Sequence, residues 1–210
     1  MNDNQNRIVG IVGRKGSGKS MRLARLLKYC PRFFVIDSMA DHTNAVPNQI
    51  YDVDEALEFI DWSKGQKTFA AAFVPGSDLE GEFEEICHEA YRRGNMAFVV
   101  EEVPFVVKPG YLPTGFAYMV RTGRHKDLDL VWTAQRASEV SRTLTSSTDL
   151  WILFSQTEPR DLDCLAERCG REVANKVAGL GLHESFVWDV IARKIIPDSP
   201  RLLKRETANT

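Results

Sequence analysis

The sequence lacks a long hydrophobic run, and this absence argues against a helix that crosses a membrane. None of its apolar stretches approaches the roughly 20 consecutive residues that a membrane span requires. Residues 1–6 are polar and lack the basic and then apolar pattern of a secretory signal. We therefore expect a protein without a transmembrane segment that is located in a cytoplasm.

Cysteine and histidine are scarce, and their spacing does not indicate a metal site. The sequence has four cysteines, at Cys30, Cys87, Cys164 and Cys169. They form no C-x-x-C pair and have no flanking histidine suited to zinc, so we expect reduced thiols that mostly fill the core. The sequence has four histidines, at His42, His88, His125 and His183. None has a partner at ligand spacing, so structural or surface roles are favoured.

An excess of charge of either sign is absent as well. The 27 Lys and Arg residues nearly balance the 29 Asp and Glu residues, which leaves a formal net charge of −2. This balance gives no overall basic surface for nucleic acid, so any contact with DNA must come from a few local loops. With 210 residues, of which 43% are hydrophobic, the chain can bury the core of one α/β domain.

What the sequence does contain is a phosphate-binding pattern, G-x-x-x-x-G-K-[ST], between the apolar run 8–12 and the helical pattern 21–27. The loop consists of Gly13, Arg14, Lys15, Gly16, Ser17, Gly18, Lys19 and Ser20. Its glycines allow consecutive backbone N–H groups to turn toward phosphate oxygens. We expect the loop to bind ATP, with Lys19 at the β- and γ-phosphates and the Ser20 hydroxyl on Mg²⁺. The alternative, a turn that only caps a strand, is disfavoured by this context.

Apolar runs alternate with helical patterns along the chain, which predicts a mostly parallel sheet covered by helices on both faces. The expected strands are 8–13, 33–36, 69–74, 96–100, 128–132 and 150–154, with a closing pair at 184–189 and 192–196. The expected helices are 18–29, 54–63, 79–93, 159–169 and 171–178, and one that ends at Arg124. Loops are expected over 41–49 and 104–113. We expect a single ATPase domain over 1–196 and a polar tail over 197–210.

Two carboxylates follow one of these predicted strands, 96–100. In a P-loop ATPase, one acid at the end of such a strand holds the Mg²⁺ shell and the next one polarises the attacking water. We therefore expect Glu101 on the metal side, and Glu102 as the general base or the residue that orients water. The alternative is a solvated turn, which the presence of the phosphate loop disfavours.

A basic cluster and a glutamine flank the predicted strand 128–132. Arg121 and Arg124 precede the strand, and Gln135 follows it. We predict that this strand lies between the strands 8–12 and 98–100, where Gln135 can touch the γ-phosphate or the attacking water. The two arginines would neutralise phosphate charge in their own site or in a neighbour's, as an arginine finger does. By itself an Arg-x-x-Arg pair more often marks a solvated helix face.

The stretch 123–136, which reads Gly-Arg-His-x-x-x-Asp-Leu-Val-Trp-Thr-Ala-Gln-Arg, resembles the sensor strand of the FtsK/HerA superfamily of DNA-pumping ATPases. Members typically have Gln-Arg at this strand end and an arginine about eleven residues upstream, the position of Arg124. The stretch 153–161 and Asp37 are similar too, so the resemblance covers residues 8 to about 165. The superfamily usually has Asp-Glu where this chain has Glu101-Glu102, which leaves the division of roles between the two acids open.

The resemblance implies a RecA/FtsK-like ATPase that uses ATP and Mg²⁺, works as a homo-oligomeric ring, typically of six subunits, and moves double-stranded DNA. Members of this size are genome-packaging ATPases of membrane-containing icosahedral viruses. Their partners would include capsid or membrane-vertex proteins, in the host cytoplasm or on the virion. Two alternatives stay open: a Zot-type assembly or secretion ATPase, which carries a membrane anchor not found here, and an ATP-binding switch or scaffold with little turnover.

Overall fold

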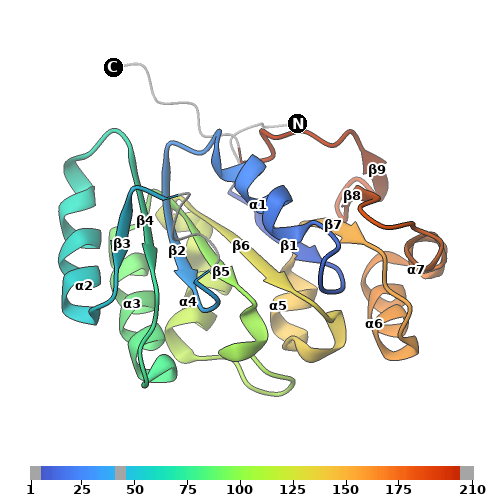
Figure 1. Ribbon diagram of the computed structural model, residues 1–210, viewed down its shortest axis with the longest axis horizontal. Coiled ribbons are helices and arrows are strands. Elements are labelled where there is room, and N and C mark those ends of the chain that lie inside the picture. Colours follow the sequence, from blue (N-terminus) through green and yellow to red (C-terminus); the bar gives the residue numbers. More distant parts are fainter. Residues whose placement is uncertain (1–5, 41–45, 204–210) are drawn as a thin grey trace.

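The computed structural model describes residues 6–40 and 46–203. Nine strands of these residues form one sheet in the order β3-β4-β2-β5-β6-β1-β7-β8-β9 (Figure 1). The strands are β1 (Ile8–Val12), β2 (Arg32–Asp37), β3 (Asn48–Ile50), β4 (Phe69–Phe73), β5 (Met96–Glu101), β6 (Leu128–Ala134), β7 (Leu150–Phe154), β8 (Ser185–Asp189) and β9 (Lys194–Ile196). The α-helices are α1 (Lys19–Leu27), α2 (Val53–Trp62), α3 (Leu79–Arg93), α4 (Thr114–Thr122), α5 (Arg142–Ser147), α6 (Pro159–Cys169) and α7 (Arg171–Ala178).

The predicted fold class and the predicted order of the central strands are both confirmed. β6 lies between β1 and β5, and Val131 of β6 is in parallel register with Val9 on one side and Val99 on the other. The closing strands β8 and β9 pair with each other, as expected, and they run antiparallel, as do β7 and β8. Because β1, β5 and β6 run parallel, the loops that follow them meet at one edge of the sheet.

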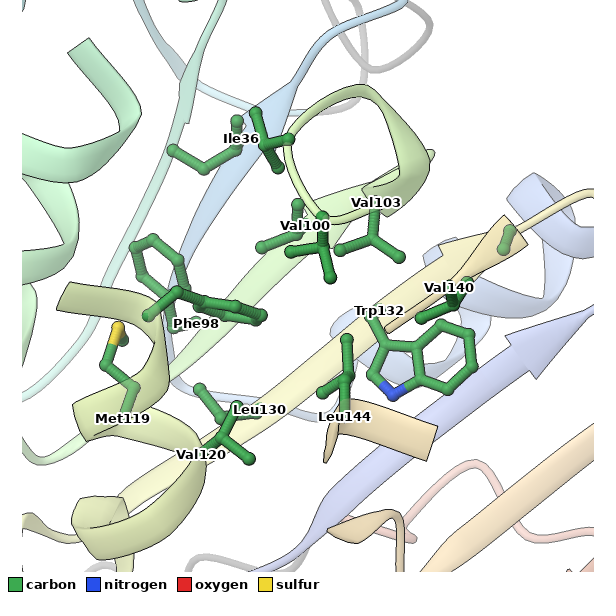
Figure 2. Packing of buried hydrophobic residues seen from close by; sticks show 14 of the residues in the cluster. Ile36, Phe98, Val100, Val103, Met119, Val120, Leu130, Trp132, Val140 and Leu144 are labelled. Carbon is green, nitrogen blue, oxygen red and sulfur yellow. The ribbon is translucent and has the colours of Figure 1, made fainter. Parts of the chain in front are cut away.

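The sheet separates two hydrophobic clusters. On the face that carries α2 to α7, Phe98 of β5 and Leu130 of β6 pack with Met119 of α4 (Figure 2). On the same face the rings of Trp132 and Trp151 meet edge to face, with centroids 5.3 Å apart. The opposite face is covered by leucines of α1, together with a short segment near the C-terminus. The sheet is therefore buried on both faces, which explains why its central strands are almost entirely apolar.

The helices are short and amphipathic. α1 places Leu23, Leu26 and Leu27 on its buried side, at the three- and four-residue spacing of a helix that covers a sheet. The longest helix, α3, begins after Asp78, whose side chain accepts a hydrogen bond from the Gly81 N–H. Among the residues described, no helix is both long and apolar enough to cross a membrane.

Two expected boundaries are wrong. The loop expected over 41–49 contains the start of the edge strand β3, which pairs with β4; residues 41–45 of that loop lie outside the described residues. β3 has three residues, of which only Ile50 is buried, so no alternation of apolar side chains marks it in the sequence. The helix expected to end at Arg124 ends at Thr122, where a 3-10 helix, Gly123–Lys126, takes over.

The expected polar tail over 197–210 is wrong for its first residues. Asp198 forms an ion pair with the buried Arg22 of α1. Leu202 and Leu203 are buried in the same hydrophobic cluster as the leucines of α1, on the face of the sheet that α1 covers. Residues 198–203 therefore pack on α1 because they bring two apolar side chains and a partner for a buried cation; residues 204–210 lie outside the described residues.

All four cysteines are free thiols. Cys30, Cys87 and Cys169 are buried, and Cys164 is half-buried, which agrees with thiols that mostly fill the core. Burial raises the pKa of Cys169 to about 12 and raises that of Cys87 as well. The thiolate form is therefore rare in these side chains at neutral pH.

Candidate nucleotide site

The loop from Gly13 to Ser20 connects β1 to α1 at the edge where the parallel strands end. Its start is fixed by a hydrogen bond from the Gly13 N–H to the carbonyl of Ala134, at the end of β6. Gly16 and Gly18 have φ of 75° and 106°, a left-handed backbone that a side chain would strain. A Cβ on Gly13 would lie 2.5 Å from Cβ of Phe154. Three positions of this loop therefore favour glycine, because a side chain there would strain the backbone or clash with Phe154.

Lys19 points back into its own loop. Its Nζ donates to the Gly13 carbonyl at 2.8 Å and lies 3.6 Å from Oε1 of Glu102. The side chain is largely buried, and burial lowers the pKa of Lys19 although Glu102 opposes this shift. The hydroxyl of Ser17 is buried against Gly13 and has no hydrogen-bond partner among the described residues. The loop therefore contains two donors for a bound anion, the Lys19 ammonium and the Ser17 hydroxyl.

Ser20 and Glu101 approach each other across the edge of the sheet. The Ser20 hydroxyl donates to Oε1 of Glu101 at 3.3 Å, and the Glu101 side chain is buried. One hydroxyl and one carboxylate fit Mg²⁺, which binds few protein oxygens and keeps its other positions for water and phosphate. Within the described residues, no group of three or more Asp, Glu, His or Cys forms a separate metal site.

Glu102 has an unusual backbone conformation. Its φ of 47° and ψ of 58° lie in the left-handed region, which is uncommon for a residue with a side chain. Its N–H donates to Oγ1 of Thr133 at 2.9 Å, and its Oε2 accepts from the N–H of Gln135 at 3.2 Å. Burial raises the pKa of Glu102, while the nearby Lys19 ammonium opposes the rise. The end of β5 is thereby tied to the end of β6.

Gln135 follows β6, which lies between the phosphate-loop strand and the strand of the two acids, and the Gln135 N–H bonds to Glu102. A second set of contacts holds the turn that contains Gln135. Nε2 of the buried Gln156 donates to the Gln135 carbonyl at 2.7 Å. The fully buried Asp161 of α6 accepts from the N–H of Ser138 at 3.0 Å and from Nε of Arg136 at 3.1 Å. Both residues lie in the stretch 153–161 that resembles the superfamily, but sequence reasoning assigned neither a role, because only the fold brings α6 to this turn.

Arg121 and Arg124 do not reach the phosphate loop of their own chain. Both line a cavity of 420 Å³ together with Arg7 and Leu128, which stand at the starts of β1 and β6. The phosphate loop follows the other end of β1. β6 has seven residues, which span about 23 Å at the rise of a strand. The expectation that these arginines act in their own site is therefore wrong; both are exposed, and only a neighbouring chain's site stays open to them.

His183 is a further residue that sequence reasoning did not place here. It lies in the loop between α7 and β8, and its Nδ1 is 3.3 Å from the carbonyl oxygen of Ser17. Its φ of 64° is also in the left-handed region. A lone histidine in a loop gives no chemical pattern, so only the fold shows that it contacts the phosphate loop.

No family model matches the sequence, and no curated protein matches it. Solved structures do match. The genome packaging NTPase B204 from Sulfolobus turreted icosahedral virus 2, in complex with AMPPCP, has a TM-score of 0.77 at 19% identity, over 91% of this chain and 96% of that one. A second structure is B204, the DNA-packaging ATPase from Sulfolobus Turreted Icosahedral Virus. Its TM-score is 0.66 at 19% identity, over 92% of this chain and 97% of that one.

The structure of a third protein, VirB4, is similar as well. VirB4 of Thermoanaerobacter pseudethanolicus has a TM-score of 0.59 at 11% identity, over 90% of this chain and 88% of that one. The B204 structures include complexes with AMPPCP and ATP-gammaS, so the fold binds nucleotides in that protein. At these identities the comparison establishes the architecture: this chain has the fold of the genome packaging NTPase B204 over nearly its whole length.

Proposed function

We propose that the chain is the subunit of an ATP-hydrolysing motor that moves double-stranded DNA, as a viral genome-packaging ATPase does. One observation supports this most: the phosphate loop, two strand-end glutamates and Gln135 meet at one edge of the sheet. Glu101 contacts Ser20 at 3.3 Å, and Glu102 contacts Gln135 at 3.2 Å and Lys19 at 3.6 Å. The fold shared with B204, a DNA-packaging ATPase, supports the DNA part of the proposal.

In this proposal the phosphate loop holds the triphosphate. The phosphate oxygens accept from the Lys19 ammonium and from amides of the loop other than those of Gly13 and Ser17, which bond to the carbonyls of Ala134 and Arg14. Lys19 gives up its hydrogen bond to the Gly13 carbonyl. Ser20 and Glu101 hold Mg²⁺, which neutralises charge on the β- and γ-phosphates when it is bound. Arg14 and Lys15 are exposed at the loop's tip and face solvent or a neighbouring subunit.

Glu102 is the general base in this proposal. Its raised pKa makes the carboxylate a stronger proton acceptor than an ordinary glutamate. Its Oε2 accepts the Gln135 N–H, so the carboxylate and Gln135 are held side by side where the attacking water would sit. Arg124, and Arg121 beside it, would complete the site of a neighbouring subunit, which makes a ring the functional unit.

The test is the ATPase rate of the full chain with and without linear duplex DNA. A motor is expected to hydrolyse ATP faster when DNA is present, and the gain should shrink as salt screens phosphate contacts. ATP hydrolysis that no DNA stimulates at low salt would contradict the DNA motor and favour the assembly or secretion ATPase. ATP binding with negligible hydrolysis under all conditions would favour a switch or scaffold.

A further inference from the structure

The order of strands fixes which way a bound nucleotide points. Glu101 and Glu102 follow β5, and Gln135 follows β6, on one side of the phosphate loop. Under the proposed function the γ-phosphate faces these groups. The phosphate chain is linear, so the nucleoside leaves the loop on the opposite side, toward β7 and β8.

On that side, three side chains from distant parts of the sequence meet at Gly18. A Cβ placed on Gly18 would lie 3.4 Å from Cε1 of Phe154, 3.6 Å from Nδ1 of His183 and 3.8 Å from Cε of Met21. His183 also contacts the Ser17 carbonyl oxygen at 3.3 Å. The α7–β8 loop, residues 179–184, therefore borders the phosphate loop at the position where the nucleoside would emerge.

Two exposed apolar side chains belong to the segments that meet here, helix α1 and the α7–β8 loop. Met21 is 69% exposed, and Leu182, the residue before His183, is 60% exposed. The α7–β8 loop, which carries Leu182 and His183, is held in shape because Oε2 of Glu184 accepts the Gly181 N–H at 2.8 Å. His183 itself has a left-handed backbone. A strained backbone at a ligand-facing position is typical of residues whose direction is fixed for binding.

We propose that His183, with Met21 and Leu182, forms the surface on which the base of the nucleoside triphosphate packs. The inference rests on the proposed function, since it needs a triphosphate in the phosphate loop. The imidazole ring offers a flat face to the base, and the thioether and the isobutyl group cover its edges. The contact involves no covalent step and no proton transfer.

The experiment compares two ligands that share the phosphates and differ in the nucleoside. ATP and inorganic tripolyphosphate are titrated into the full chain by calorimetry, for the wild type and for His183→Ala. Loss of base stacking is expected to raise the Kd for ATP by about tenfold, with the Kd for tripolyphosphate unchanged. Met21→Ala and Leu182→Ala, both at exposed positions, should each raise the ATP Kd by a smaller factor.

Two further variants control for folding. His183→Gly suits the φ of 64° and should weaken ATP binding as the alanine variant does. His88→Ala removes a histidine on α3, remote from the loop, and should leave both affinities unchanged. ATP affinity unaltered by His183→Ala would overturn the proposal, and so would an equal loss for ATP and tripolyphosphate, which would mean that His183 only supports Ser17. A wild type that binds neither ligand would refute the proposed function itself.

Discussion

At the scale of single residues, the site depends on backbone conformations that few side chains tolerate. Glu102 keeps a left-handed backbone, at a cost of about 1 to 3 kcal/mol for a residue of this kind. The hydrogen bonds from its N–H to Thr133 and from Gln135 to its carboxylate offset this cost. The conformation turns the Glu102 side chain toward Lys19, whereas the preceding Glu101 side chain faces Ser20. One strand end therefore supplies two acids to two different partners.

Replacing Glu102 by glutamine separates binding from hydrolysis. Glu102→Gln keeps an oxygen that can accept the Gln135 N–H but removes the proton acceptor. We expect nucleotide affinity within a few-fold of the wild type and turnover lower by about a hundredfold or more. Glu58→Gln, at an exposed position of α2, is the control and should not change turnover. Turnover close to that of the wild type would exclude Glu102 as the base.

Gly10 is a residue whose importance the sequence does not show. A Cβ at this position of β1 would lie 2.5 Å from Cζ2 of Trp132, whose ring is fully buried. We expect Gly10→Ala to lower the free energy of unfolding by about 1 to 3 kcal/mol, since the tryptophan must move in a packed core. Urea denaturation checks this. Gly65→Ala, with open space around its Cβ, should be close to neutral, and an equal loss in both variants would be evidence against the clash.

At the scale of helices and strands, the turn that follows β6 is tied to α6 and to the segment before it. Asp161 is fully buried and accepts hydrogen bonds from Ser138 and Arg136, directly after Gln135. Gln156 binds the Gln135 carbonyl from the loop before α6. A movement of the Gln135 turn would therefore pull on α6 through these contacts.

Asp161→Asn tests this connection. The amide keeps one acceptor oxygen and loses the charge that binds Arg136, so we expect a loss of about 1 to 3 kcal/mol in unfolding free energy. Turnover should fall as well, because the Gln135 turn is no longer held in place. Asp163→Asn, two residues along α6, removes an exposed ion pair with Arg171 and should change stability by less than about 0.5 kcal/mol. Equal effects of the two substitutions would rule out a special role for Asp161.

The sequence predicts most of these elements because their signals are local. The apolar strands, α3, α6 and α7 follow from periodicity, and the phosphate loop follows from spacing and glycine content. β3 has too few apolar residues to be recognised, and the packing of residues 198–203 on α1 depends on contacts made across the whole chain. The positions of Asp161, Gln156 and His183 could not be predicted for the same reason, since each reaches the site through the fold.

At the scale of the whole molecule, the proposed site residues lie at two opposite edges of the sheet. The phosphate loop, both glutamates and Gln135 lie at one edge of the sheet, and Arg121 and Arg124 lie at the other. Among the described residues neither arginine forms an ion pair, and both are exposed. This arrangement suits donation of an arginine to the next subunit of an assembly, as proposed above.

Mixing two inactive variants tests this donation. Lys19→Ala removes phosphate binding, and Arg124→Ala removes the donated arginine, so each variant alone should hydrolyse ATP poorly. In a mixture, an Arg124→Ala subunit keeps its phosphate loop and can receive the arginine of a Lys19→Ala neighbour. We expect partial recovery of the ATPase rate, measured at constant total protein. A mixture no more active than its components would show that Arg124 does not act between subunits.

The edge-to-face pair of Trp132 and Trp151 gives the molecule an optical signal of its own. Two indole rings 5.3 Å apart at 86° couple their electronic transitions, and this coupling gives a circular dichroism couplet that an isolated indole lacks. Trp132 stands three residues before Gln135 on β6, and its Nε1 donates to Thr148 at 3.1 Å. The couplet therefore reports the packing of the strand that carries Gln135, without any attached label. A nucleotide that shifts β6 against β7 would be visible as a change in the shape of this spectrum.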